Sequence, residues 1–393
     1  MNKLSLACTA ICLCSGAAHA QTSVNIYGLI DLGLTYNNKV ATSPGGATAG
    51  KLSMDSGSRL GSRLGFIGSE DLGAGLKAYF QLESGFNADT GAMAFSSQTG
   101  KNDVLFGRRA LVGLSGHYGN VSMGRQYDIL TEIGGATSSL LSFGTIMQNI
   151  HGGLGLDRVG LTLTNNSVKY ETPNLDGWVG SAIVGLGEQA GNRAAGQAMG
   201  VGGKYQRGPL FVGLGYYQSK LGATPADASF SSIGAASGNP GDTALKTATV
   251  GASYQMGVTR WYGALSLLRQ PLARAATTPL LVTFLPTGTQ FVMGGSNNDR
   301  TVVLDAGVDY ALSAALCLSA SVEHAAVSFV NAGRGRMNQL NLGVDYLFSK
   351  RTDIYAMWVS SRAADLYSTG ALFIPTGGAN PQNAVRIGLR HTF

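Results

Sequence analysis

The final residues of the chain alternate between two kinds of side chain. One parity is mainly apolar and the other is charged or small; the first carries Val385, Ile387, Leu389, His391 and Phe393, and the second Arg386, Gly388, Arg390 and Thr392. Because successive side chains of a strand point to opposite faces, this pattern predicts a strand with one apolar face. The segment stops at Phe393, and we expect it to pair with the first strand and close a ring.

The same alternation recurs along the whole chain. It marks about sixteen segments, at 24–36, 59–69, 76–86, 105–115, 119–125, 167–172, 178–186, 198–207, 209–219, 246–255, 259–269, 300–312, 315–327, 337–348, 352–360 and 383–393. Many have the ~9–11 residues that a tilted strand needs to cross a membrane. The pattern is weakest at 198–207 and 352–360, so totals of about 14 or 18 strands also fit.

The connections between these segments alternate between long and short. The short ones are 70–75, 116–118, 173–177, 208, 256–258, 313–314 and 349–351; the long ones are 37–58, 87–104, 126–166, 187–197, 220–245, 270–299, 328–336 and 361–382. An up-and-down barrel places every short turn at one rim and every long loop at the other. A soluble sandwich has no reason to sort its loops in this way.

The second face of each segment carries polar and charged side chains, and no neighbouring pattern in the sequence indicates that they are buried. In 302–310, for example, the apolar parity opposes a face that carries Asp305 and Asp309. An apolar outer face and a polar inner face indicate lipid outside and water inside. The sequence therefore predicts an all-β protein, a transmembrane antiparallel up-and-down β-barrel.

The composition agrees with an exported barrel. Only 13% of the 393 residues are charged, 57 are Gly, and the formal net charge is +6. No apolar run after residue 20 has the ~18 residues of a helical span. Residues 1–20 are expected to be a cleaved signal peptide, because Lys3 precedes an apolar core and Ala18-His19-Ala20 is a small-x-small cleavage site. Residues 21–393 would be the barrel domain, in which Cys317 has no partner for a disulfide.

No motif in the sequence indicates an enzyme. The histidines after the signal segment lack metal-ligand spacing; they are His117, His151, His324 and His391. No Ser/His/Asp set stands out, and Gly-x-Gly runs such as 185–187 lack the helix of a nucleotide site. We expect no catalytic residue, cofactor or metal, and no nucleic-acid partner.

Stretches spread over the whole length resemble the general, non-specific porins of the Gram-negative outer membrane. They include SVNIYGLIDLGL (23–34), SRLGFIGSEDLGAGLKAYFQLESGF (62–86), FGRRALVGLSG (106–116), GRQYD (124–128), NNSVKYETPNLDG (165–177), GASYQMG (251–257), DAGVDYALS (305–313), LGVDYLFSKRTDIYA (342–356) and VRIGLRHTF (385–393). The resemblance implies a homotrimer of sixteen-stranded barrels in the outer membrane, in contact with lipid and lipopolysaccharide. Each barrel would pass small hydrophilic solutes and ions, and its third long loop, here 126–166, would fold into the lumen.

A pore discriminates ions by the fixed charges at its narrowest ring. Near the third loop, parity places five basic residues and two acids on the luminal face, namely Arg59, Arg63, Lys77, Arg109, Lys169, Glu83 and Glu171. Arg108 and Arg125 fall on the apolar parity, and a bulge at Gly107 or Gly124 would turn them inward. The resemblance favours an inward Arg125 and leaves Arg108 open.

The third loop contributes Asp128, Glu132, Asp157 and Arg158. An acidic loop that faces a basic wall would set up a transverse field in the gap. We expect a weak to moderate anion preference, softened by screening over ~8 Å at physiological salt. The alternatives are a substrate-specific channel, a barrel hydrolase, for which His151 and Asp157 are a poor start, and an adhesin that binds through 220–245 and 270–299.

Overall fold

The computed structural model of the chain describes residues 23–41, 48–94, 104–144, 150–151, 157–160, 162–222, 226, 239–274, 291–292, 298–330, 333–364, 367–368 and 381–393. The predicted signal peptide at 1–20 lies outside these residues, as do parts of several long loops. In the described part of the chain, no helix has both the length and the apolar character of a membrane span.

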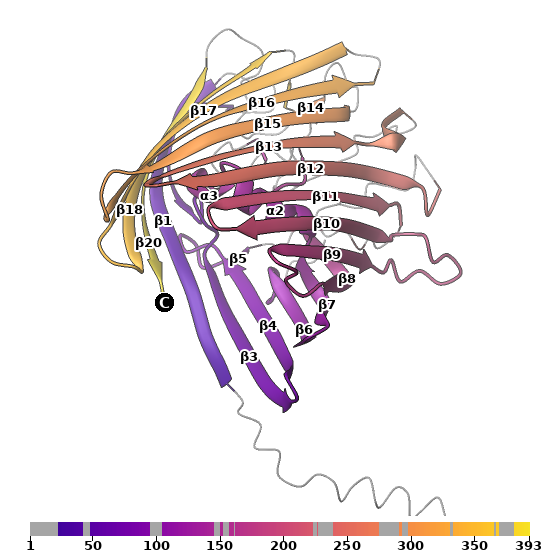
Figure 1. Cartoon of the computed structure of the whole chain (residues 1–393). Coiled ribbons are helices and arrows are strands. Elements are labelled where there is room, and N and C mark those ends of the chain that lie inside the picture. The colour runs from indigo at the N-terminus through magenta and orange to yellow at the C-terminus, as the bar shows by residue number, and fades with distance from the viewer. Residues whose placement is uncertain are drawn as a thin grey trace, which may run out of the picture.

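The strands form a closed antiparallel barrel (Figure 1). One sheet contains 18 strands, but β2 and β3 lie end to end beside β1, and β5 is a two-residue extension beside β4. The wall therefore makes 16 crossings, which confirms the count expected from the sequence. The wall strands are β1 (Ser23–Ala41), β2 (Thr48–Ser56), β3 (Arg63–Gly73), β4 (Leu76–Phe86), β5 (Met93–Ala94), β6 (Arg109–Gly116), β7 (Gly119–Tyr127), β8 (Leu163–Glu171), β9 (Trp178–Gly185), β10 (Ala198–Arg207), β11 (Leu210–Lys220), β12 (Thr243–Met256), β13 (Thr259–Arg269), β15 (Asn298–Ala311), β16 (Leu316–Phe329), β17 (Gly333–Leu347), β18 (Thr352–Ala364) and β20 (Gln382–Thr392).

The remaining elements are short. β14 (Phe291–Val292) and β19 (Tyr367–Ser368) pair with each other in a separate two-stranded sheet. The helices are α2 (Ile129–Thr137) and α3 (Leu140–Phe143), and η3 (Pro271–Arg274) is a 3-10 turn.

The first and last strands close the ring. β20 pairs with β1 from Leu29↔Thr392 to Asn37↔Ala384. The N–H of Gly28 donates to the carbonyl of Phe393 at 3.0 Å, and the N–H of Phe393 donates back at 3.1 Å. A Cβ on residue 28 would lie 2.2 Å from Cζ of the Phe393 ring. The glycine therefore makes room for the terminal ring over the seam.

Several strand boundaries differ from the prediction; residues 105–108, for example, were predicted as strand but form a turn and bend before β6. Residues 48–56 form β2 rather than loop, because Leu52 and Met54 continue the apolar outer face of the wall. Residues 59–62, predicted as strand, form a bend between β2 and β3. The connection expected at 328–336 is short, because β16 reaches Phe329 and β17 begins at Gly333.

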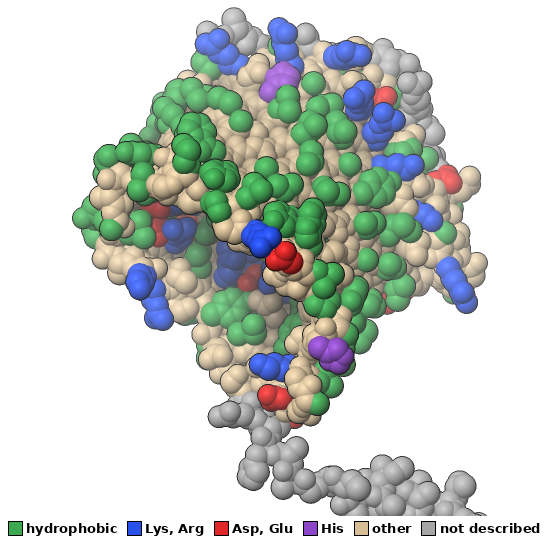
Figure 2. Space-filling view, in the orientation of Figure 1, with side chains coloured by type: hydrophobic (Ala, Val, Ile, Leu, Met, Phe, Trp, Pro, Cys, Tyr) green, Lys and Arg blue, Asp and Glu red, His purple; other side chains and the backbone are tan. Residues whose placement is uncertain are grey.

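The wall is not equally tall all round. β6, β7, β8 and β9 contain 8 or 9 residues each, whereas β15, β16, β17 and β18 contain 13 to 15. Along the whole wall, apolar side chains on the outer parity are exposed, as Figure 2 shows for one face of the molecule. Polar side chains on the inner parity are mostly buried, which agrees with the predicted faces.

The third long loop folds into the barrel. α2 lies against β10, β11 and β12, inside the wall (Figure 1). Leu214 is 55% exposed on the outer face, so its neighbours Gly213 and Gly215 face inward. A Cβ at Gly215 would lie 2.7 Å from Leu130, and one at Gly213 would lie 2.9 Å from Ile133. Two glycines of β11 thus form the surface on which the helix packs.

Deleting Phe393 should destabilise the barrel, because it removes two backbone hydrogen bonds and a ring that covers the seam. The expected loss is about 2–4 kcal/mol. The change can be measured by heating the protein in detergent and following, by gel electrophoresis, the different mobilities of the folded and unfolded chains. A Thr392→Ala change, which keeps the ladder and the ring, serves as the control. Equal melting of the deletion variant and wild type would contradict this role.

Candidate functional site

The narrow part of the lumen is organised by the bend between β2 and β3. The carboxylate of Asp31, on β1, accepts hydrogen bonds from the N–H groups of Arg59 at 2.8 Å and Leu60 at 2.9 Å. Asp31 is fully buried and also bonds Tyr355 and Arg386 across the seam. The backbone of the bend is therefore fixed, and it presents Arg59, and Arg63 directly after it, to the lumen.

Four arginines converge on one cavity between the wall and the third loop. The cavity has a volume of about 250 Å³ and is lined on the wall side by Arg59, Arg63, Arg108 and Arg109. The loop side contributes Thr131, Glu132 and Leu141. Residues from the bend, from the start of β6 and from the third loop thus meet at one gap. The structure brings together Arg59, Arg63, Arg109 and Glu132, four of the residues singled out from the sequence.

The arginines differ in how far their charge is already neutralised. Arg59 pairs with Asp345 at 2.5 Å and with Asp353 at 3.4 Å. Arg108 pairs with Glu83 at 2.5 Å, so the residue whose orientation the sequence left open turns inward. Among the described residues, no carboxylate lies within 4.0 Å of Arg63 or Arg109. Arg109 instead donates to Gln81 and lies over the ring of Tyr127, 4.7 Å from its centroid.

On the loop side, only one of the expected acids faces the gap. Asp128 caps α2 and pairs with Arg158 at 3.0 Å, and both side chains are fully buried. Asp157 is buried too and pairs with His151. These three predicted site residues therefore stabilise the loop from within instead of lining the cavity. The sequence could not show this, because parity arguments apply to strands and not to a folded loop.

Glu132 is the acid that remains at the gap, and it is balanced by two lysines. It forms ion pairs with Lys169 of β8 and with Lys204 of β10. Although burial favours the neutral acid, these lysines hold the pKa of Glu132 below its ordinary value of 4.5. Lys204 was missed from the sequence, because one lysine in a Gly-rich strand gives no signal until α2 is placed beside it.

The last two predicted basic residues lie elsewhere. Lys77 is exposed beside the short turn between β3 and β4 and is not among the residues that line the cavity. Arg125 is buried, and it donates to the carbonyl of Gly107 and to Asn165 at 2.5 Å. The ladder between β7 and β8 is irregular beside Arg125, and Gly124 has a φ of +130°.

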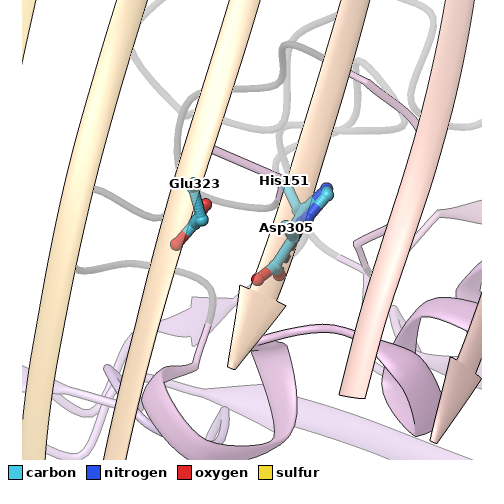
Figure 3. A group of neighbouring side chains, drawn as sticks. All are labelled: His151, Asp305 and Glu323. Carbon is cyan, nitrogen blue, oxygen red and sulfur yellow. Dashed lines mark hydrogen bonds and ion pairs between the residues drawn. The ribbon is translucent and has the colours of Figure 1, made fainter. Parts of the chain in front are cut away.

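The return limb of the loop is attached to the wall by His151. Its Nδ1 lies 2.7 Å from Asp157, and its Nε2 lies 3.1 Å from Asp305 of β15. Figure 3 shows His151, Asp305 and Glu323 side by side. Glu323 accepts hydrogen bonds from the N–H of Ile150 and from Ser139, so it holds the loop at two further points.

These three side chains offer ligand atoms within 4.8 Å of one another, the spacing of a metal site. However, both ring nitrogens of His151 face carboxylates, and both oxygens of Glu323 accept hydrogen bonds. The arrangement is that of an imidazolium ion pair. Asp305 and Glu323 were missed as loop anchors, because each is one of many acids on a luminal parity.

Comparison with known proteins agrees with this geometry. Residues 7–365 match the family model described as Gram-negative porin. The chain belongs to this family. Over the full length of both chains, the porin is 30% identical to an outer membrane porin protein of Bordetella pertussis and 29% identical to outer membrane porin protein 32 of Delftia acidovorans.

Two solved structures share the fold of this porin. The anion-selective porin from Comamonas acidovorans has a TM-score of 0.67 at 23% identity, covering 95% of this chain and 100% of that one. The trimer form of OmpT from Vibrio cholerae has a TM-score of 0.63 at 16% identity, covering 95% and 99%. This porin is therefore a multi-pass β-barrel channel of the outer membrane, and not an enzyme.

The attachment of the loop should depend on the protonation of His151. Although burial favours the neutral ring, Asp157 and Asp305 raise the pKa of His151 well above its ordinary value of 6.5. Because the pKa of His151 is higher in the folded protein than in the unfolded chain, its ion pairs stabilise the fold fully at pH values below the unfolded-state pKa. This stabilisation is lost as the pH rises through the folded-state pKa and the ring loses its proton. Open-channel current noise should thus stay low near pH 6.5 and increase only as the pH rises through the raised pKa of His151.

A His151→Gln variant tests this dependence, because a neutral amide has its donors on one nitrogen and cannot pair as a cation with two carboxylates. Its current noise should already be high at neutral pH and should change little with pH. His117→Gln, at an exposed turn residue, is the matched control. Noise that is identical in wild type and His151→Gln over the whole pH range would show that the loop does not depend on this contact.

Proposed function

We propose that this porin is a passive diffusion channel with a weak to moderate preference for small anions. The observation that carries the proposal is the pair of arginines at the gap, Arg63 and Arg109, that no described carboxylate balances within 4.0 Å. Because fixed charges at the narrowest ring decide which ions pass, an excess of guanidinium groups favours anions.

The other charges near the gap do not reverse this sign. The acids near the gap are already paired, Glu83 with Arg108 and Glu132 with Lys169 and Lys204. On the wall beyond the bend, Asp345 and Asp353 face Arg59 and Arg390. Paired charges contribute little net field to the gap, and salt screens the remainder over ~8 Å. We therefore infer a graded preference and not strict exclusion of cations.

The related proteins support the same function. The anion-selective porin from Comamonas acidovorans shares the fold, and both full-length relatives are named as outer membrane porins. We further propose that residues 1–20 are a signal peptide, that 21–393 form the barrel domain, and that three copies assemble as a homotrimer. The assembled protein would contact outer-membrane lipid and lipopolysaccharide.

A charge reversal at Arg109 should shift the selectivity toward cations. We expect the anion-to-cation permeability ratio to fall several-fold in Arg109→Glu, because a guanidinium without a described carboxylate partner becomes a carboxylate at the gap. The zero-current potential of a planar bilayer in a KCl gradient measures the ratio. Lys77→Glu reverses an exposed charge outside the cavity and should have a smaller effect. If both variants shift the potential equally, net charge and not the constriction sets the preference.

Conductance should appear in groups of three equal steps if the channel is a homotrimer. Single insertion events in a planar bilayer measure the grouping, and chemical crosslinking of the detergent-extracted protein gives an independent count. Saturation of the current by one solute would instead favour the substrate-specific alternative. Solitary steps of one size, together with a monomer on crosslinking, would refute the trimer.

A further inference from the structure

The gap between the wall and the third loop has an apolar lining as well as a basic one. Leu60 of the bend and Leu140, Leu141 and Val159 of the loop line the same cavity as the arginines. Leu140 and Val159 are buried, but Leu141 is 48% exposed although it lies inside the barrel. One exposed leucine alone is ordinary. Here it forms part of a small cavity that guanidinium groups also line, so the gap is amphipathic.

The two arginines that no described carboxylate balances lie on either side of one strand. Arg63 of β3 is opposite Gly85 of β4, and Arg109 of β6 is opposite Glu83 of β4. Because neighbouring strands are ~4.8 Å apart, the two backbones are separated by roughly 10 Å across the sheet. Both side chains line the cavity, so their guanidinium groups can approach one small anion from two sides. The planar fork of a guanidinium matches the two oxygens of a carboxylate.

Tyr127 adds a hydrogen-bond donor to the same cavity. Its ring centroid lies 4.7 Å from the guanidinium carbon of Arg109 and 5.8 Å from that of Arg108. The side chain is only 6% exposed, and its hydroxyl has no hydrogen-bond partner among the described residues. Buried hydroxyls are normally paired. Since Tyr127 lines the cavity, this hydroxyl can donate to a solute there, and the guanidinium groups beside it favour an anionic solute.

The size of the cavity limits what can occupy it. Its volume of about 250 Å³ is below the ~300–1,000 Å³ of pockets for drug-sized ligands. It therefore suits a solute with one ring or one short branched chain. An apolar lining with a few convergent polar groups is the usual construction of a small-molecule site. A chloride ion would use the guanidinium groups and leave Leu60 and Leu141 against water.

We propose that the gap is a binding subsite for small carboxylates with an apolar body, and that aromatic monocarboxylates are the class that fits it. The carboxylate lies between Arg63 and Arg109 and accepts a hydrogen bond from Tyr127. The body packs against Leu60 and Leu141. This inference rests on the anion preference proposed above and names the class of anion that the gap favours. Binding has to be weak enough for the solute to leave, so the subsite delays a passing solute without closing the channel to chloride.

Block of the KCl current by benzoate tests the proposal in the full mature protein. In a planar bilayer at constant ionic strength, the decrease of current and the added noise give an apparent affinity for each solute. Benzoate should bind at least about tenfold more tightly than acetate, which has the same carboxylate and no ring. Benzamide, which has the ring without the charge, should have no effect.

Two variants separate the contributions of the apolar and polar contacts. Leu141→Asn should lower the benzoate-to-acetate affinity ratio to near one, because it removes the apolar contact. Tyr127→Phe keeps the ring beside Arg109 and should weaken both acids by a similar factor, about tenfold, because only the hydroxyl is lost. The matched control is Leu72→Asn, because Leu72 is 47% exposed at the end of β3 and lies outside the cavity. This control should bind both acids as wild type does.

Equal affinity of wild type for benzoate and acetate would overturn the proposal, since charge alone would then be recognised. Stronger block by succinate than by benzoate would also overturn it, because the arginines would then select a second carboxylate over an apolar body. The same ratio in Leu141→Asn and Leu72→Asn would refute the contact with Leu141. Failure of the anion preference itself would appear in wild type as a cation-side potential in a KCl gradient without organic acid, so the two failures are distinguishable.

Discussion

The whole structure depends on one constraint, the need to satisfy backbone hydrogen bonds where no water is available. A strand in hydrocarbon must have a paired neighbour on both sides, so a sheet that crosses a membrane has to close. Here the closure is made by β1, which pairs with β20 on one side and with β2 and β3 on the other. Once the ring is closed, the period of two fixes which side chains meet lipid and which meet water.

The closed ring also explains how one small gap acquires so much charge. Inward side chains from distant parts of the sequence are forced to share an aqueous interior, where they pair. Arg59 meets Asp345 and Arg386 meets Asp31, across the seam of the barrel. The third loop packs α2 on the opposite wall, so the arginines of the bend face it across a cavity. The anion preference that we propose would then follow from incomplete pairing, because the ring supplies no acid for some of the guanidinium groups at the gap.

Much of the fold could be predicted from the sequence, because its physical cause is local. The alternation in a segment such as 302–310 can be recognised without knowing which strand pairs with it. This alternation predicted most strands, the short turns and the two faces of the wall correctly. Ends of strands were less predictable, since residues 48–56, 328–329 and 333–336 belong to strands with little change in composition. The sequence also identified Arg63 and Arg109, which are inward-facing by the same parity, and Arg59, which reaches the gap from the bend before β3.

The interior of the loop could not be predicted for a physical reason. Whether Asp128 or Asp157 faces the gap depends on where α2 lies, and α2 is placed by glycines of β11 that are more than seventy residues away. The charge at the gap is therefore set by long-range packing. The same holds for Lys204 and Asp305, whose roles arise only when the loop is folded against them.

The uneven height of the wall has a consequence for the surrounding bilayer. A strand needs ~9–11 residues to cross the hydrocarbon layer, and the segment from β6 to β9 offers only 8 or 9. A solitary barrel would force the lipid to become thinner along this low side, at a cost of fractions of a kcal/mol per ångström of mismatch. Burying that flank against a neighbour of equal height relieves the deformation, so elastic strain in the membrane itself favours association of copies along their low sides.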